Sequence, residues 1–148
     1  MIYISSDHRG LDLKNYLFND LLSKGFEITD LGPKTIDPSD DYPDYASIVA
    51  KRVQKDDVGK GILICANGVG VSITANKFNG IRATLSWTPQ HAESSRRDDN
   101  SNILALPSDY ISKEQALETT LAWLNTPFSN EERYQRRINK IRNIENES

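Results

Sequence analysis

The chain has 148 residues, of which 37% are hydrophobic and 26% are charged, and its formal net charge is −3. These values predict one folded domain over residues 1–148 and give no support for a nucleic-acid-binding surface. No apolar run approaches the length of a membrane span, and the first residues lack the basic region and long apolar core of a signal peptide.

The sequence contains one cysteine and two histidines. A single cysteine, Cys65, cannot form an internal disulfide, so we expect a reducing, cytoplasmic setting. His8 and His91 lie far from Cys65 in the sequence and follow no recognisable ligand spacing, so no metal site is predicted.

Hydrophobic periodicity and turn residues predict strands that alternate with helices along the whole chain. In chain order, we expect a strand over residues 2–6, a helix over 11–24, a strand over 26–31, a helix over 43–55, a strand over 62–64, a helix over 69–78, a strand over 81–86, a helix over 89–97, a strand over 102–106 and helices over 112–125 and 131–143.

Several helix ends carry recognisable signals. Gly25 suits a C-terminal stop, Pro43 a first helical turn and Thr88 an N-cap. Ser112 opens a helix with a glutamine three residues later, as in a capping box. Asn130 or the preceding serine is expected to cap the last helix.

Alternating strands and helices require a parallel sheet that is covered by helices on both faces. With right-handed crossovers, this predicts a three-layer, Rossmann-like, doubly wound α/β fold with a five-stranded parallel sheet. Such sheets bind ligands beyond the carboxyl ends of their strands. Four groups are expected at that edge: Asp7 with His8, the segment from Cys65 to Gly70, Ser86 with Trp87, and the loop that follows the fifth strand.

Cys65 stands at the end of the third strand, directly before a small glycine turn and a helix. A thiol near a helix N-terminus has its thiolate favoured by the helix dipole and by N–H donors, and it could serve as a nucleophile or a base. The alternative is a buried cysteine of the core.

Gly68 and Gly70 could let the backbone approach a ligand and hold an anion or a developing oxyanion. The alternative is a plain tight turn. A dinucleotide site is poorly supported, because Ile73 stands where a third glycine is expected. A nucleoside triphosphate loop also fails, because no Gly-Lys-Ser/Thr follows at the required spacing.

Other charged residues each have two interpretations. Asp7 and His8 could bind a sugar hydroxyl or a phosphate, and Asp7 could instead cap a turn or helix. Arg133 and Arg137 share one helical face and could clamp a phosphate, or they could belong to a solvated charged face. His91 lies in a predicted helix and is interpreted as a surface or packing residue.

Several segments together resemble a known family over essentially the whole chain. They are residues 6–10 (Ser-Asp-His-Arg-Gly), residues 41–46 (Asp-Tyr-Pro-Asp-Tyr-Ala), residues 61–78, residues 80–83 (Gly-Ile-Arg-Ala) and residues 133–137. The family is that of ribose-5-phosphate isomerase B and related sugar-phosphate isomerases, including the galactose-6-phosphate isomerase subunits.

The resemblance implies an aldose–ketose isomerase that opens the sugar ring and moves a proton between C1 and C2 through an enediolate. Cys65 would be the base, and Ala66, Asn67, Gly68, Val69 and Gly70 would hold the enediolate oxygens. Asp7, His8 and Tyr42 would contact the substrate, and Arg133 and Arg137 its phosphate. The family builds its site at a dimer interface and uses no metal or organic cofactor.

The sequence departs from the family at four places. Asp98 and Asp99 replace the ring-opening histidine and the asparagine that follows it. Asp109 stands where a third phosphate-binding arginine is usual. The turn that begins at Cys65 reads Cys-Ala-Asn-Gly here, whereas the family usually has Cys-Gly-Thr-Gly. Tyr134 replaces a histidine that usually stands beside Arg133. An ionised aspartate can only accept a proton, unless its pKa is raised by burial.

We therefore expect an aldose–ketose isomerase acting on a sugar phosphate of the pentose 5-phosphate type or on a related sugar. Asp98, or a water that it positions, would replace the ring-opening histidine, and Asp99 would contact the substrate. The chain is expected to form a homodimer or a dimer of dimers, with the helix of residues 130–145 packing on a partner subunit. Two alternatives remain: a catalytically impaired sugar-binding or partner subunit, and a thiol hydrolase built on Cys65 with His8 or His91.

Overall fold

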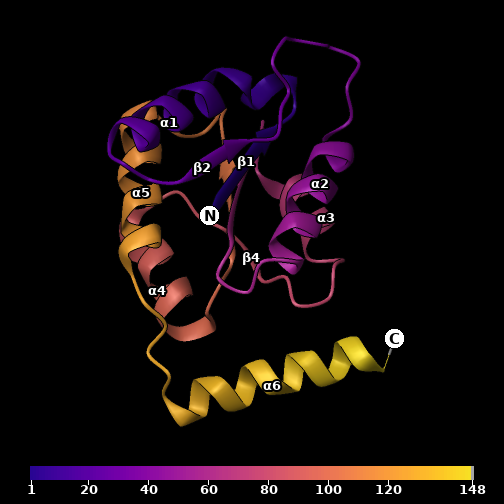
Figure 1. The fold of residues 1–148 in the computed structure, drawn as a ribbon, viewed down its shortest axis with the longest axis vertical. Coiled ribbons are helices and arrows are strands. Elements are labelled where there is room, and N and C mark those ends of the chain that lie inside the picture. Colours follow the sequence, from indigo (N-terminus) through magenta and orange to yellow (C-terminus); the bar gives the residue numbers. More distant parts are fainter. Residues whose placement is uncertain (148) are drawn as a thin grey trace.

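A computed structural model describes residues 1–147 as one parallel sheet with helices on both faces (Figure 1). In chain order the elements are β1 (Ile2–Ser6), a 3₁₀ turn η1 (His8–Gly10), α1 (Leu11–Ser23), β2 (Ile28–Asp30), α2 (Tyr42–Gln54), β3 (Lys60–Cys65), α3 (Val69–Ala75), β4 (Ala83–Leu85), α4 (Pro89–Asp99), β5 (Ile103–Pro107), α5 (Lys113–Asn125) and α6 (Glu132–Asn146). The strand order is β2-β1-β3-β5-β4. The predicted fold class is confirmed.

Two hydrophobic cores fill the space between the sheet and its helices. Helices α1, α4 and α5 pack on one face around buried residues that include Leu17, Leu104 and Trp123. Helices α2 and α3 pack on the other face around Val49, Leu63 and other buried side chains. The central strands β1, β3 and β5 are almost wholly buried because both of their faces are covered.

The two edge strands are shorter than predicted. β2 covers residues 28–30 instead of 26–31, and β4 covers residues 83–85 instead of 81–86. An edge strand hydrogen-bonds on one side only, so its length is limited by its register with a single neighbour. The apolar pattern extends beyond that register and therefore predicts too long a strand.

Most predicted helix ends are confirmed. Gly25 has a positive φ of 88°, Pro43 lies in the first turn of α2, and the side chains of Thr88 and Ser112 cap α4 and α5. The predicted cap of the last helix is wrong. Asn130 has a φ of 58°, whereas an N-cap residue takes an extended backbone, and Glu131 occupies the cap position.

Helix α6 lies across the amino-terminal edge of the sheet, at the bottom of Figure 1. Ile138 is buried, and the carboxylate of Glu145 accepts a hydrogen bond from the Gly80 N–H at 2.9 Å. Within residues 1–147, no helix combines the length and the apolar character that crossing a lipid bilayer would require.

Candidate active site

Cys65 ends β3 on the carboxyl-terminal edge of the sheet and is 3% exposed. Its carbonyl accepts a hydrogen bond from the Ser108 N–H at 2.9 Å, which joins the end of β3 to the loop after β5. Its Sγ lies 3.8 Å from Oδ1 of Asn67. The thiol is therefore buried, as expected of a core cysteine, but it lies at the edge of the sheet where a reactive thiol was expected.

The turn after Cys65 is as tight as its glycines suggest. Gly68 has a φ of 73°, and a Cβ there would lie 2.5 Å from the Leu85 side chain. Asn67 Oδ1 accepts the Val69 N–H at 3.0 Å. The next two amides, of Gly70 and Val71, donate no hydrogen bond within residues 1–147, so they are available to an incoming oxygen.

Tyr42, the first residue of α2, lies directly against this turn. A Cβ on Gly70 would come within 2.4 Å of the Tyr42 ring, so the ring occupies the space that a side chain at position 70 would need. Tyr42 is 40% exposed. The structure thus brings Tyr42 to the Cys65 turn, although 23 positions separate them in the sequence.

Asp7 lies beside the end of β3, because its N–H donates to the Ile64 carbonyl at 3.3 Å. Its Oδ1 accepts the N–H groups of Arg9 and Gly10, each at 3.0 Å. Burial raises the pKa of Asp7, and these two hydrogen bonds only partly oppose that effect. The expectation that Asp7 could cap a turn is therefore confirmed, and its second carboxylate oxygen remains for other contacts.

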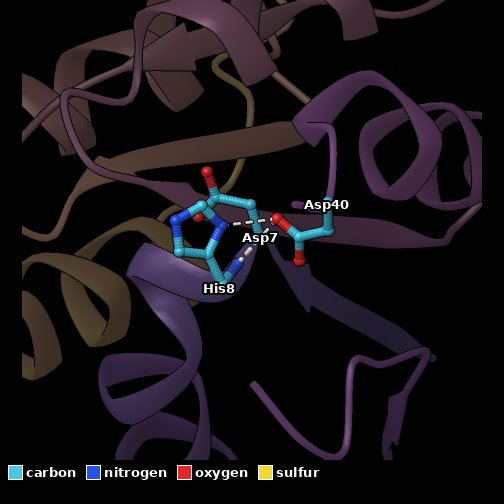
Figure 2. Close-up of side chains that lie close together, drawn as sticks. All are labelled: Asp7, His8 and Asp40. Carbon is cyan, nitrogen blue, oxygen red and sulfur yellow. Dashed lines mark hydrogen bonds and ion pairs between the residues drawn. The ribbon is translucent and has the colours of Figure 1, made fainter. Parts of the chain in front are cut away.

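His8 pairs with Asp40, a residue that the sequence did not single out. The His8 Nδ1 lies 2.6 Å from Asp40 Oδ1, and the Asp40 side chain is 5% exposed (Figure 2). Asp7, His8 and Asp40 place three possible metal-ligand atoms within 4.8 Å of one another. However, His8 already shares Nδ1 with Asp40, and Asp7 accepts two backbone N–H groups. Hydrogen bonds within the protein thus engage one atom of each of the three side chains, whereas Asp40 Oδ2 is buried without a partner among residues 1–147.

Arg9 and Asp109 form an ion pair at the rim of the same edge, 2.6 Å apart. Both backbones are tied to the Cys65 segment: the Asp109 N–H donates to the Ala66 carbonyl, and the Ser108 hydroxyl reaches the carbonyls of Arg9 and Cys65. A guanidinium therefore does lie at this rim, but it belongs to the loop after β1 and is neutralised by Asp109.

Asp98, Asp99, Arg133 and Arg137 form a second group, far from Cys65. A crossover helix runs antiparallel to the strands, so the end of α4 lies at the amino-terminal edge of the sheet. The first turns of α6 join it there, beneath the body of Figure 1. One chain therefore does not bring these four residues to Cys65.

Charge contacts define this second group. Asp98 pairs with Arg97 at 3.0 Å, and Arg133 pairs with Glu131 at 3.1 Å. Desolvation and repulsion from Asp98 raise the pKa of Asp99, while Arg137 opposes the shift. The guanidinium groups of Arg133 and Arg137 lie 4.6 and 5.6 Å from the ring of Tyr134. Two guanidinium groups and two carboxylates thus share one surface.

The sequence matches the family model for Ribose/Galactose Isomerase over residues 2–141. The chain belongs to this family. It is 42% identical over 148 residues to the probable ribose-5-phosphate isomerase B of Mycoplasma genitalium, covering 99% of this chain and 97% of that protein. It is 40% identical over 144 residues to ribose-5-phosphate isomerase B of Escherichia coli, covering 97% and 95%.

A solved structure of ribose-5-phosphate isomerase B from Mycoplasma genitalium with bound ribulose-5-phosphate has the same fold. Its TM-score is 0.96 at 41% identity, and the match covers 99% of this chain and 97% of that one. The structure of a ribose 5-phosphate isomerase from Thermotoga maritima gives 0.92 at 42% identity, with 96% and 97% covered. The predicted family and the predicted enzyme class, an aldose–ketose isomerase, are confirmed.

The structure brings together only some of the predicted site residues, namely those around Cys65. Asp7, His8 and Tyr42 gather with the Cys65–Gly70 segment at one edge of the sheet. Neither His8 nor His91 hydrogen-bonds to Cys65 within residues 1–147; His91 bonds the Ser86 hydroxyl instead. A cysteine–histidine hydrolase therefore finds no support in the geometry.

Proposed function

We propose that this isomerase interconverts an aldose phosphate and a ketose phosphate of the pentose 5-phosphate type, with Cys65 as the proton-transfer base. The observation that supports it most is the contact of the Cys65 thiol with Asn67, in the turn that leads to the unpaired amides of Gly70 and Val71. A thiolate there would take a proton from the carbon next to the carbonyl. The amides would stabilise the negative charge that develops on oxygen.

The reaction neither gains nor loses protons overall. Cys65 removes the proton from C2 of the aldose and returns a proton to C1 of the ketose, while a second proton passes from the C2 hydroxyl to the C1 oxygen. The protonated thiol exchanges with solvent while the enediolate is bound, so part of the returned proton comes from water. Relatives named ribose-5-phosphate isomerase B, one of them solved with ribulose-5-phosphate, support a pentose phosphate as the substrate. Tyr42 would line the pocket, and Asp7 and His8 would contact the sugar hydroxyls.

The site is proposed to be shared between two copies of the chain. Arg133 and Arg137 are exposed, and they belong to α6, which lies at the opposite edge of the sheet from Cys65. A second copy could present its own α6 to the Cys65 edge. Its arginines would then take the phosphate, and its Asp98 and Asp99 would face the sugar ring. This arrangement would also cover apolar surface on α6, where Ile141 is 44% exposed.

Ring opening needs a group that can both give and take a proton. Asp99 has the raised pKa that helps a carboxyl group to hold a proton, whereas Asp98 is engaged by Arg97. We propose that this pair of carboxyl groups replaces the ring-opening histidine, with Asp98 positioning a water or acting directly and Asp99 contacting the sugar.

Proton exchange tests the role of Cys65. Wild-type protein should incorporate solvent deuterium at C2 of ribose 5-phosphate, and Cys65→Ala should abolish this exchange while the protein stays folded. Ser47→Ala is the control, because that hydroxyl bonds only the Asp44 carbonyl on α2. Normal exchange in Cys65→Ala would remove the thiol from the mechanism. No turnover of any sugar phosphate by the wild type would favour the alternative, a partner subunit without activity.

Mixing two inactive variants tests the shared site. Cys65→Ala and Arg133→Ala/Arg137→Ala chains should each be inactive alone. After they are unfolded and refolded together in equal amounts, half of the dimers should be mixed, each with one intact site, which restores about one quarter of wild-type activity. If every site lay within one chain, mixing would restore nothing.

A further inference from the structure

A second cavity, of about 440 Å³, opens at the amino-terminal edge of the sheet, away from Cys65. It lies between the end of α2, the start of β3, the loop before β4 and helix α6. Its lining brings four cationic side chains together: Lys60, Arg82, Arg96 and Arg142. Its volume is in the range of small-molecule sites.

Arg96 is buried and Arg82 is half-buried, and neither forms an ion pair within residues 1–147. Arg82 donates to the carbonyls of Asp99 and Asn100 at 3.1 and 2.8 Å. Arg96 donates to the Thr126 carbonyl and to the Asn100 side chain. Carbonyl oxygens satisfy these N–H groups but bring no negative charge. Buried charges in proteins are normally paired with an opposite charge, and within residues 1–147 neither guanidinium has a carboxylate partner.

Lys60 adds a third positive charge without a partner. It is the half-buried first residue of β3, and its backbone N–H donates to the Met1 carbonyl at 3.1 Å, but its ammonium group makes no hydrogen bond or ion pair within the described part of the chain. Burial and repulsion from Arg96 lower its pKa. Arg142 faces the same cavity from α6 and also forms no ion pair with residues 1–147.

Acidic residues compensate only part of this charge. Asp56 and Asp57 also line the cavity. Asp56 accepts hydrogen bonds from the Tyr3 hydroxyl at 3.1 Å and from the Val58 N–H at 3.3 Å. Glu145 and Asp99 act on Arg82 only from a distance. The four cations thus outnumber the two lining carboxylates.

We propose that this cavity binds the phosphate group of a small anion, at a site separate from the isomerase centre. Guanidinium and ammonium groups that converge on a cavity are the donors that phosphate prefers. A bound phosphate would relieve the repulsion among Lys60, Arg96 and Arg82. It would also join β3 to Arg142, and so fasten α6, whose first turns carry Arg133 and Arg137, to the body of the chain.

Calorimetric titration with inorganic phosphate tests this site. An Arg133→Met/Arg137→Met protein removes the arginines proposed for the substrate and should still bind phosphate. Adding Lys60→Met should weaken that binding by at least about tenfold, the effect of losing a charge-assisted hydrogen bond. The matched control is Lys55→Met, an exposed lysine at the end of α2 outside the cavity, which should leave the affinity unchanged.

Ribose 5-phosphate is the second probe in the same proteins. If the binding of either phosphate or ribose 5-phosphate depends on Lys60, the result supports the site. Comparison of the two affinities shows whether the sugar increases the affinity. Absence of phosphate binding once Arg133 and Arg137 are replaced would overturn the proposal. So would equal affinities with and without Lys60. Neither result would bear on the role of Cys65, so the two proposals fail independently.

Thermal unfolding shows whether the Lys60→Met variant is still folded. Lys60→Met removes a repelling charge, so its melting temperature without phosphate should not fall. In the Arg133→Met/Arg137→Met background, phosphate should raise the melting temperature of the protein that keeps Lys60, and it should raise that of the Lys60→Met protein less. If Lys60→Met unfolds, Arg142→Gln replaces it, because that side chain lies on the exposed face of α6. In the Arg133→Met/Arg137→Met background, an equal phosphate-induced rise with and without Arg142→Gln would then overturn the proposal.

Discussion

The buried ion pair between Lys14 and Asp30 allows a sharp test of the packing behind the active site. Lys14 is fully buried on α1, and its Nζ lies 2.7 and 2.6 Å from the two carboxylate oxygens of Asp30. Asp30 ends β2, and its Oδ1 also accepts the Gly32 N–H at 2.8 Å. The pair therefore anchors the start of the loop that carries Asp40 to His8.

The two partners should respond unequally to substitution. Asp30→Asn leaves a buried ammonium without its counter-charge, which costs about 3–5 kcal/mol of the free energy of unfolding. Lys14→Met leaves Asp30 with the Lys34 ammonium at 2.9 Å and the Gly32 N–H. That variant loses a charge-assisted hydrogen bond, or about 1.5–3 kcal/mol. Asp30→Asn should therefore be the more damaging change by roughly 1–2 kcal/mol.

Urea unfolding at one protein concentration measures the difference. With a slope of about 1–3 kcal/mol per molar urea, the two midpoints should be separated by roughly 1 M. Asp12→Asn is the control, since Asp12 pairs with Lys113 on the surface and should contribute less than about 1 kcal/mol. A Lys14→Met protein as unstable as Asp30→Asn would refute the reasoning, because Lys34 would then not support Asp30.

The free energy of unfolding that Asp30→Asn loses should depend on pH, which gives an independent test of the ion pair. Burial already lowers the pKa of Lys14 in the wild type, and Asp30 opposes that effect. Without Asp30, the folded pKa of Lys14 falls further below its unfolded value of about 10.4. The unfolded chain then binds more protons than the folded one, so stability rises with pH between those two values. The deficit relative to wild type should shrink across that window.

Two further predictions concern the site itself. Asp40→Ala removes the hydrogen-bond partner of the His8 ring and should raise KM for the sugar phosphate by roughly tenfold. Asp40→Asn keeps an acceptor oxygen, so its KM should rise less. Steady-state kinetics measures both changes. Gly70→Ala pushes its Cβ into the Tyr42 ring and should lower kcat/KM by about tenfold or more, but in a Tyr42→Ala background it should cost nothing further.

The first half of the site was predictable because topology determines it. A parallel sheet places the carboxyl ends of its strands on one edge, so a loop after β1 and a turn after β3 must lie close together. Asp7 and Cys65 follow from that rule. The contact between Gly70 and Tyr42 does not follow from it, because that contact depends on where α2 begins after the loop of residues 31–41.

Pairs formed between loops were invisible in the sequence. Asp40 is 32 residues from His8, and Asp109 is 100 residues from Arg9. Neither separation follows a helical or strand period, so no local pattern signals the contact. The run of three polar residues before Tyr42 marks only a turn. The path of the loop that places Asp40 beside His8 is set by tertiary packing.

The position of Asp98 and Asp99, in contrast, could have been deduced. The sequence suggested a polar loop at these residues, but α4 continues through both and ends at Asn100, whose φ of 49° suits a helix C-terminus. A helix that follows β4 and leads into a parallel strand must end at the opposite edge from Cys65. The same topology that supports a site at Cys65 therefore implies that Asp98 cannot complete it within one chain.

The ion pair between Arg9 and Asp109 changes the meaning of the acidic substitutions. Three carboxylates at Asp109, Asp98 and Asp99 would by themselves disfavour a phosphate dianion in the pocket. However, Asp109 is neutralised by Arg9 at 2.6 Å, so it adds no net negative charge at the Cys65 rim. Asp98 is likewise engaged by Arg97. With Arg133 and Arg137 from a second copy, two guanidinium groups would offset the carboxylates of Asp99 and Glu131 opposite the sugar phosphate, so the acidic residues alone do not argue for a substrate without phosphate.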